Sequence, residues 1–282
     1  MSRKSIAIAV DALSADFIFP IWHRYYSNLF GAENLFVTTF EGGDPGFSDF
    51  ELGKLTVAEG FYNDDKRVKL INATVAELLK RYDVVIRVDV DEFLVVDPAR
   101  YGSLREFLES WEGPYITARG FDLMQWRDEN PLDPSKKVLH QRQWGYALDA
   151  MNKTCVTRVP FKWGRGFHYC SAPPAFGEVF LFHLKRIDLE QERSWCRKML
   201  ESAKGDVFVT EYYSSELGFI DSFARSRWNL PADEGPDALI RDAFLAEFRA
   251  KVHFVPETGS FDGPYEQEKR NIRIPDRFRD LF

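Results

Sequence analysis

Short apolar runs alternate with stretches of helical spacing in the N-terminal part of the chain. Ser5–Val10 and Asn34–Phe40 are rich in apolar, β-branched and aromatic residues, which predicts two strands. Between them, apolar positions recur at helical spacing after Pro20, and the run stops at Gly31, a common residue at a helix C-terminus. This strand, helix, strand order predicts a parallel pair with a right-handed connection.

The same alternation continues toward residue 120. Val57–Phe61 is a third short strand or an irregular segment, and Lys66–Lys80 has the apolar spacing of a helix packed on a sheet. Val84–Val96 has the composition of a strand buried on both faces. A helix over Ser103–Trp111 and a strand over Tyr115–Arg119 follow. The pattern predicts an α/β fold with a mostly parallel sheet flanked by helices.

Three carboxylates interrupt the apolar run of Val84–Val96, namely Asp89, Asp91 and Glu92. Buried carboxylates are costly unless they are paired or bind a cation. Side chains alternate along a strand, so Asp89 and Asp91 are predicted to project from the same face. Oxygen ligands of this kind suit Mg²⁺ or Mn²⁺. The alternative is that Asp91 and Glu92 only solvate the end of a strand.

Polar residues also follow the first two predicted strands. Asp11 ends the first strand, and the turn residues of Glu41–Gly46 predict a loop after the second. Ligands of open α/β sheets bind beyond the carboxyl ends of the strands. Asp11 is therefore a candidate to bind a ribose or base, and a capping or turn role is the alternative.

Basic residues gather in Val138–Arg186, although the whole chain is acidic. They include Arg142, Lys153, Arg158, Lys162, Arg165, His168, His183, Lys185 and Arg186, against only Asp149 and Glu178. Such a local excess suits an anionic ligand. Val179–His183 is predicted to be a strand ending in a histidine, which would complete an oxygen shell around Mn²⁺ better than around Mg²⁺. A core histidine is the alternative for His183, and a structural turn is the alternative for His168.

The remaining segments predict a loop and a helical C-terminal part. Asp128–Lys137 is polar and contains proline, as in a lid or acceptor loop. Helical spacing occurs in Leu189–Ala203, Phe219–Trp228 and Ala238–Val252. We therefore predict an α/β domain over residues 1–188 that carries the ligand site, and a mostly helical extension over 189–282.

Composition narrows the function classes. The net charge of -7 argues against non-specific nucleic-acid binding, and aromatics at 15% suit surfaces that stack on sugars. The three cysteines show no zinc or disulfide spacing. The apolar run near the N-terminus is shorter than a signal peptide requires, and no segment is long enough to span a membrane. These features predict a cytoplasmic protein, with peripheral membrane contact left open.

Several motifs together resemble nucleotide-sugar glycosyltransferases of the GT-A fold, in particular the family 2-like and family 92-like group. They occur in the family's order over roughly the first 200 residues. The matching stretches are Ile21–Val37, Asp89–Phe93, Gln141–Arg142 followed by Asn152–Thr154, Gly166–His168 and Phe182–Lys185. The Asp-Gly-Ser/Thr cluster of classical family 2 members is replaced here by Glu41-Gly-Gly-Asp44.

The resemblance implies a GT-A-like, Rossmann-like domain and a set of site residues. Asp89, Asp91 and His183 would hold Mn²⁺ or Mg²⁺ at the diphosphate of the donor. Asp89 would contact either the ribose or the metal, and Lys153 and Lys185 would be candidates to stabilise the departing diphosphate. Arg142 and His168 are further candidates to contact the donor, together with Asp11, which was already a candidate from its position. A nucleotide-diphosphate sugar, most simply a UDP-sugar, would be the donor, and a glycan or other hydroxyl compound the acceptor.

An inverting transferase also needs a carboxylate that deprotonates the acceptor hydroxyl. Asp149, Asp122 and Glu178 are the candidates, and Asp149 is preferred because it follows an aromatic stretch at Trp144–Tyr146. The rival functions are a nucleotidyl or phosphoryl transferase and a catalytically inactive nucleotide-sugar-binding module. The chain lacks a glycine-rich phosphate loop of the Walker type, which disfavours the first rival.

Overall fold

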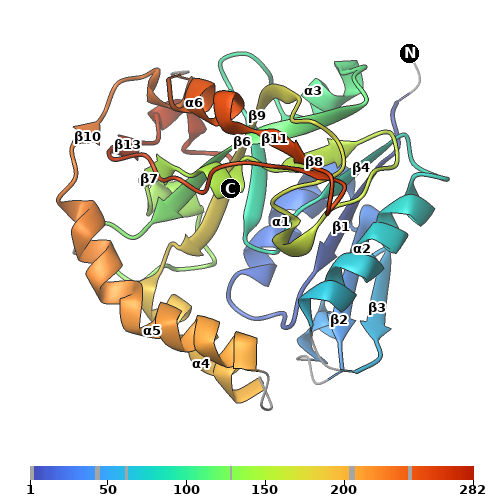
Figure 1. The fold of residues 1–282 in the computed structure, drawn as a ribbon, viewed down its shortest axis with the longest axis horizontal. Helices are drawn as coiled ribbons and strands as arrows, with labels where there is room; N and C mark the ends of the chain where they lie inside the picture. The colour runs from blue at the N-terminus through green and yellow to red at the C-terminus, as the bar shows by residue number, and fades with distance from the viewer. Residues whose placement is uncertain (1–2, 42–44, 61–62, 128, 203–206, 241–242) are drawn as a thin grey trace. The chain divides into compact units, whose positions relative to one another are not determined.

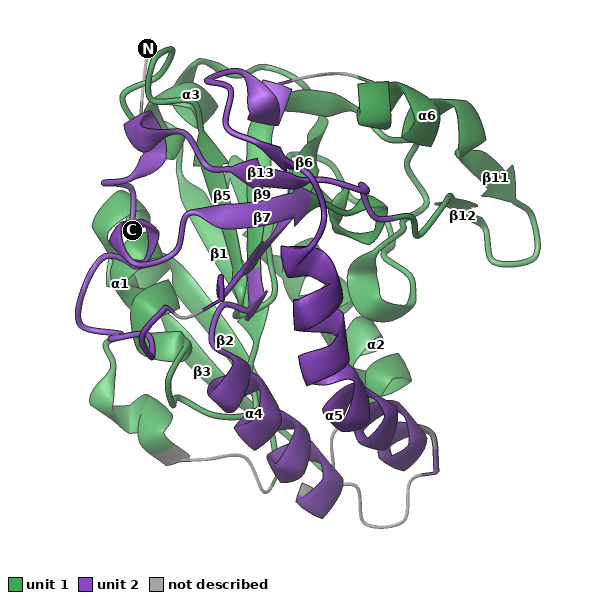
Figure 2. Ribbon diagram, turned by 90° about the vertical axis from the view of Figure 1, so that its left-hand side faces the viewer, with its two compact units in different colours: residues 1–121, 147–183, 242–266 green, residues 122–146, 184–241, 267–282 purple. Residues whose placement is uncertain are grey.

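The computed structural model describes residues 3–41, 45–60, 63–127, 129–202, 207–240 and 243–282. The chain forms two compact units, each built from three segments (Figure 2). Unit 1 comprises residues 1–121, 147–183 and 242–266, and unit 2 comprises 122–146, 184–241 and 267–282. The units interleave along the sequence, whereas the predicted boundary after residue 188 divides the chain once. That residues 1–188 carry the function stays a prediction.

Unit 1 is organised around a parallel sheet with strand order β4, β1, β2, β3. These strands are β1 (Ile6–Asp11), β2 (Leu35–Phe40), β3 (Lys54–Ala58) and β4 (Val84–Arg87). Helices α1 (Phe19–Phe30) and α2 (Asp64–Leu78) connect them (Figure 1). The predicted α/β class, with a parallel core and flanking helices, is confirmed.

The packing of α2 follows from the residues of β1. Ala7 and Ala9 project from one face of β1 and meet Ile71 and Val75 of α2 in a buried cluster. The small alanines let the helix approach closely, and Asn63 caps it by accepting a hydrogen bond from the Lys66 amide. The helix is thereby held so that its first turns lie near the carboxyl end of β1.

Antiparallel strands extend the sheet of unit 1. They are β5 (Glu92–Val96), β6 (Tyr115–Met124), β8 (Thr154–Thr157) and β9 (Phe176–Arg186), of which β6 and β9 run on into unit 2. Strand β8 pairs with β4 and β6, and β5 pairs with β9 so that Glu92 lies opposite His183. Unit 1 also contains α3 (Leu104–Ser110), α6 (Ala243–Lys251), β11 (His253–Val255) and β12 (Ser260–Asp262).

Among its described residues, unit 2 contains two long helices and three short strands. They are α4 (Leu189–Ser202), α5 (Val207–Trp228), β7 (Trp144–Ala147, whose last residue is assigned to unit 1), β10 (Ala232–Asp233) and β13 (Asn271–Arg273). Among the described residues, no helix combines the length and apolar character that crossing a bilayer requires. The predicted helical extension over residues 189–282 also contains short strands, namely β10, β11, β12 and β13.

Three sequence-based predictions need correction. Val84–Val96 is not one strand, because β4 ends at Arg87, a turn covers Val90 and Asp91, and β5 leaves to pair with β9. The argument that strand alternation puts Asp89 and Asp91 on one face is therefore wrong. His183 lies inside β9 and does not end it. Predicted features at residues 42–44, 61, 128, 203 and 241–242 lie outside the described residues.

Candidate active site

The carboxyl ends of β1 and β4 bring opposite charges together. The two strands are parallel, with Ala9 in register with Arg87, so Asp11 and Arg87 meet at the same edge of the sheet. Nη2 of Arg87 lies 3.4 Å from Oδ1 of Asp11, and Arg67 of α2 donates from Nε to Oδ2 of Asp11 at 2.5 Å. Asp11 therefore sits at the predicted edge, held by two arginines.

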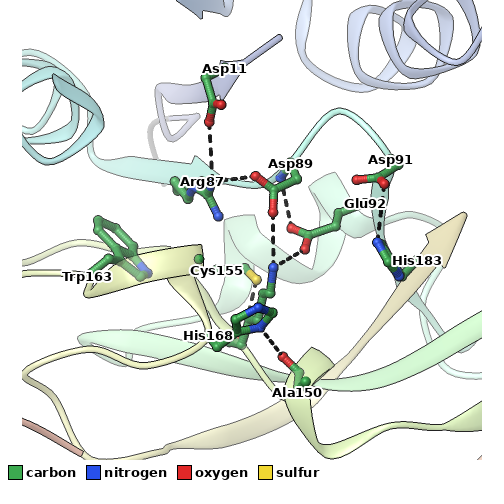
Figure 3. A network of polar contacts seen from close by, with 12 residues as sticks. Asp11, Arg87, Asp89, Asp91, Glu92, Ala150, Cys155, Trp163, His168 and His183 are labelled. Carbon is green, nitrogen blue, oxygen red and sulfur yellow. Dashed lines mark hydrogen bonds and ion pairs between the residues drawn. The ribbon is translucent and has the colours of Figure 1, made fainter. Parts of the chain in front are cut away.

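Asp89 is the centre of a cluster of cations (Figure 3). Its Oδ1 accepts hydrogen bonds from Arg67 and from Nη2 of Arg87, the latter at 2.5 Å, and its Oδ2 accepts one from Nζ of Lys153 at 3.0 Å. Burial raises the pKa of Asp89, but the cations of Arg67, Arg87 and Lys153 outweigh it and hold this pKa well below its usual range. Asp89 is thus ionised, and both of its oxygens are bonded to protein cations.

Lys153 is a buried ammonium shared between two carboxylates. It lies 2.5 Å from Oε1 of Glu92 and is only 3% exposed, and the second Glu92 oxygen accepts from the amide of Asp89 at 2.8 Å. Burial lowers the pKa of Lys153, but the charges of Glu92 and Asp89 outweigh this effect, so the pKa is raised overall. Burial, followed by the charge of Asp89, raises the pKa of Glu92. Lys153 therefore retains its charge inside the site.

Asp91 and His183 form a separate pair that is more open to solvent. Oδ2 of Asp91 and Nε2 of His183 are 3.2 Å apart, and the Asp91 side chain is 29% exposed (Figure 3). Burial raises the pKa of Asp91, but His183 outweighs it and the pKa is lowered overall. A carboxylate oxygen and an imidazole nitrogen that converge in this way suit Mn²⁺ or Mg²⁺, with further positions filled by ligand oxygens and water.

The fit to a metal ion is therefore uneven across the predicted ligands. Asp91 and His183 fit, whereas Asp89 directs its oxygens at Arg67, Arg87 and Lys153. Within the described ranges, no group of three or more His, Cys, Asp or Glu side chains is arranged to hold a metal. A metal at this site would draw its remaining ligands from a bound phosphate or water.

A tight turn places Phe167 and His168 on two sides of the site. Arg87 stacks over the Phe167 ring at 3.2 Å and Arg67 at 4.6 Å from its centroid. Gly166 has φ 63°, and a Cβ there would come within 2.7 Å of the His168 ring, so glycine is needed. Phe167 also has a positive φ of 56°, a strained value for an aromatic residue. The turn thus explains the Gly-Phe-His motif.

His168 is held in a defined tautomer. Its Nδ1 lies 2.7 Å from the Ala150 carbonyl, which can only accept, so Nδ1 carries the proton. Burial, followed by the charge of Lys153, lowers the pKa of His168 to about 3. The ring is neutral at physiological pH, and Nε2 carries the lone pair.

Asp149 is a buried carboxyl in the short 3₁₀ turn Asp149–Met151, the same turn that carries the carbonyl of Ala150. The residue is 3% exposed, and none of the described residues donates a hydrogen bond to its Oδ1. Burial is the main cause that raises the pKa of Asp149 to about 7, and the nearby charges of Glu266 and Glu247 contribute. Asp149 is therefore poised to exchange a proton near neutral pH.

The structure places the other predicted residues in different surroundings. In unit 1, Glu178 binds Arg100 and the hydroxyl of Tyr101. In unit 2, Asp122 accepts a hydrogen bond from Tyr146 at 2.5 Å. Also in unit 2, the guanidinium of Arg142 donates to the carbonyls of Ile187, Gln141 and Asn130, and Lys185 pairs with Glu216. The structure thus brings Asp11, Asp89, Asp91, Lys153, His168 and His183 together within unit 1.

Sequence reasoning missed Arg67, Arg87 and Tyr265. Arg87 carried a usable signal, because a charged residue in an otherwise apolar strand, two positions before Asp89, calls for a partner. Arg67 and Tyr265 carried none, since each reaches the site only through folding of segments distant in sequence from Asp89.

The solved structures that resemble the chain at low similarity include two of S. aureus TarS. The crystal structure of S. aureus TarS aligns with a TM-score of 0.30 and 12% identity, covering 78% of this chain and 44% of that chain. The crystal structure of S. aureus TarS 1-349 aligns with a TM-score of 0.29 and 11% identity, covering 80% of this chain and 73% of that chain. This chain spans less than half the length of the first of these. No protein-family model and no curated protein matches this chain.

Proposed function

We propose that this protein is a metal-dependent glycosyltransferase that moves a sugar from a nucleotide-diphosphate sugar, most simply a UDP-sugar, to a hydroxyl acceptor such as a glycan. The observation that carries the proposal is the Asp91 and His183 pair, 3.2 Å apart, beside the buried cation of Lys153. A metal ligand pair and a fixed ammonium are what a departing diphosphate requires. The motifs that resemble the GT-A transferases supply these same residues.

Each residue has a distinct part in the proposed reaction. Asp91 and His183 would hold Mn²⁺ or Mg²⁺, which when bound acts as a Lewis acid toward the diphosphate. Lys153, kept charged by Glu92 and Asp89, adds fixed positive charge where the leaving group becomes more negative. Asp11 and Asp89 remain the candidates for the ribose, because their carboxylates lie at the carboxyl edge of the parallel strands.

Asp149 is the proposed base that accepts the proton of the acceptor hydroxyl in an inverting displacement. Of the three predicted candidates, Glu178 is bonded to Arg100 and Tyr101, and Asp122 is bonded to Tyr146. Asp149 is the one whose pKa is raised to about 7, close to the value that suits a general base. Its raised pKa also makes the proposal testable by a pH profile.

The test is hydrolysis of a panel of UDP- and GDP-sugars with and without Mn²⁺. We expect release of the nucleoside diphosphate only with the metal, and an increase in melting temperature with UDP or GDP plus Mn²⁺. The Asp91→Asn variant should lose both effects, while Asp280→Asn, an exposed carboxylate in unit 2, should lose neither. Stabilisation by nucleoside triphosphates alone would instead support a nucleotidyl or phosphoryl transferase.

One observation favours a second candidate, an inactive nucleotide-sugar-binding module. Asp89 has both oxygens bonded to protein cations, which leaves Asp91 and His183 as the fitting metal ligands among the described residues. In that case the Asp91→Ala variant would keep wild-type nucleotide affinity, and no donor would be hydrolysed. The same panel therefore separates the two candidates.

A further inference from the structure

The segment that follows β12 brings an exposed aromatic ring to the side of the site occupied by Asp149 and His168. Tyr265 is 58% exposed, and its ring meets the His168 ring at 5.9 Å and the Tyr169 ring at 5.4 Å, edge to face in both cases. Large aromatic rings left exposed beside a site are common contact surfaces for ligands. Tyr265 therefore needs an account beyond packing.

Backbone hydrogen bonds fix this segment in position. The hydroxyl of Tyr169 donates to the carbonyls of Gly263 at 2.9 Å and Pro264 at 3.1 Å, and the amide of Asp149 donates to the carbonyl of Glu266 at 3.0 Å. Tyr265 lies between these anchor points. Its ring is thus presented on a rigid support and not on a free loop.

The turn at Arg165–Phe167 gives the two sides of the site different partners. Phe167 packs under Arg67 and Arg87, which bind Asp11 at the end of β1. His168 instead bonds to the carbonyl of Ala150, beside Asp149, and carries Tyr265 on its ring. If the nucleoside of the donor occupies the Asp11 side, the Tyr265 side is left for the acceptor.

The charges around Asp149 indicate the chemistry of that acceptor. Glu266 and Glu247 act on Asp149, with Lys251 opposing them, and Lys251 is itself paired with Glu266 at 2.6 Å. The charge of Asp262 also acts on Tyr265, and the charge of Lys153 opposes it, but Lys153 is already paired with Asp89 and Glu92. An acceptor carrying phosphate or carboxylate would be repelled here, whereas an uncharged ring with an apolar face would stack on tyrosine.

Resting on the proposed function, we infer that Tyr265 is the stacking platform for an uncharged sugar ring of the acceptor, and that it presents a hydroxyl of this ring to Asp149. Sugar rings combine an apolar face of C–H groups with hydroxyls at the edge. Stacking on Tyr265 would leave the edge hydroxyls available to Asp149. Tyr265 is thus a residue that determines acceptor affinity, separate from the residues that bind the donor.

The test measures consumption of the UDP-sugar hydrolysed best by the wild type, with Mn²⁺, in the presence of neutral methyl glycosides or of glucuronate and glucose 6-phosphate. We expect at least one neutral glycoside to accelerate donor consumption and the charged sugars to have no effect. The Tyr265→Ala variant should raise KM for that glycoside about tenfold. Its rate of donor hydrolysis in water and its affinity for UDP with Mn²⁺ should match the wild type.

Matched variants separate stacking from a structural role. Tyr265→Phe and Tyr265→Trp keep an aromatic ring and should retain the acceptor KM within about threefold. Phe254→Ala removes an exposed aromatic ring of β11 that contacts Phe261 and should leave the acceptor KM unchanged. Equal KM values for wild type and Tyr265→Ala, or acceleration only by charged sugars, would overturn the inference.

The two proposals fail in different ways. If no donor is hydrolysed and no nucleotide binds with Mn²⁺, the proposed function is wrong. If donor hydrolysis proceeds but no neutral glycoside accelerates it, the function stands and the platform inference is rejected.

Discussion

The two units contain buried charge clusters of opposite design. In unit 1 the carboxylate of Asp89 is surrounded by the cations of Arg67, Arg87 and Lys153. In unit 2 the guanidinium of Arg186 faces the carboxylates of Asp122, Glu192 and Glu216, the closest being Glu192 at 2.5 Å. Both clusters satisfy their charges internally, so burial of charge does not by itself identify a site.

The sign of the charge on the central side chain distinguishes the two clusters. Cations arranged around a carboxylate can turn toward a phosphate when an anionic ligand arrives, whereas carboxylates arranged around a cation repel such a ligand. The unit 1 cluster also borders the more open Asp91 and His183 pair, while the Glu192 side chain in unit 2 is 1% exposed. We therefore predict that the unit 1 cluster binds the ligand and that the unit 2 cluster has a structural role.

The largest difference is expected from removing one buried cation in each cluster. Lys153→Met strands Glu92, and Arg186→Met strands Glu192, so each should lower the free energy of unfolding by about 3 kcal/mol. Urea unfolding at pH 7 measures this loss. At a temperature where both variants are folded, only Lys153→Met should lose stabilisation by UDP with Mn²⁺. If both variants lost stabilisation by UDP with Mn²⁺ equally, the distinction between the clusters would be removed.

Titration of one carboxyl in each unit gives the next contrast. Asp149 and Glu192 each have a pKa raised to about 7, chiefly by burial. A raised carboxyl pKa means that the folded state holds its proton more tightly than the unfolded state. Stability from this source is complete below about pH 4 and is lost as the pH rises toward 7.

Asp149→Asn should therefore flatten that part of the stability profile and gain roughly 2 kcal/mol relative to wild type at pH 8. Wild-type kcat/KM should rise with pH through about 7, and Asp149→Asn should remove most of this activity. Glu192→Gln should leave the pH dependence of activity as in wild type. Denaturant curves and rates from pH 4 to 9 check both statements, and a shifted activity profile in Glu192→Gln would contradict them.

A smaller effect is expected at the metal pair. His183→Gln removes the imidazole beside Asp91 and should raise the Mn²⁺ concentration for half-maximal donor hydrolysis at least tenfold. His140→Gln alters an exposed histidine of unit 2 that lies 2.8 Å from Asp280, and should have no effect. A Mn²⁺ titration measures the change. An unchanged requirement in His183→Gln would exclude this residue as a ligand.

The smallest effect is expected at Lys185, a predicted donor-binding residue. Its ammonium pairs with Glu216, and although burial lowers its pKa, Tyr212 and Glu216 raise it overall. Because this cation already has an anionic partner in unit 2, Lys185→Met should change UDP affinity less than about threefold. Calorimetric titration with UDP and Mn²⁺ checks this. A loss of UDP affinity above tenfold would show that Lys185 binds the donor.

The contrast between Asp91 and Asp149 shows which parts of the site could be predicted. Asp89, Asp91 and His183 carried sequence signals because each follows or interrupts an apolar run. The pairing of Asp91 with His183 depends on β5 and β9 lying antiparallel with Glu92 opposite His183, a register between segments some 90 residues apart. Asp149 was a candidate by position, but its raised pKa comes chiefly from burial, which depends on tertiary packing, with the charges of Glu266 and Glu247 contributing.

The parallel strands, their helices and the presence of a carboxylate cluster could be predicted from the sequence, since these follow from local periodicity and from the cost of burying charge. Tertiary structure decided that the chain turns after Asp89, that Arg67 and Arg87 neutralise Asp89, and that Tyr265 reaches His168. The reason is physical: periodicity reports which face of an element is buried, but the partner of a buried charge is set by contacts between segments that are far apart in the chain.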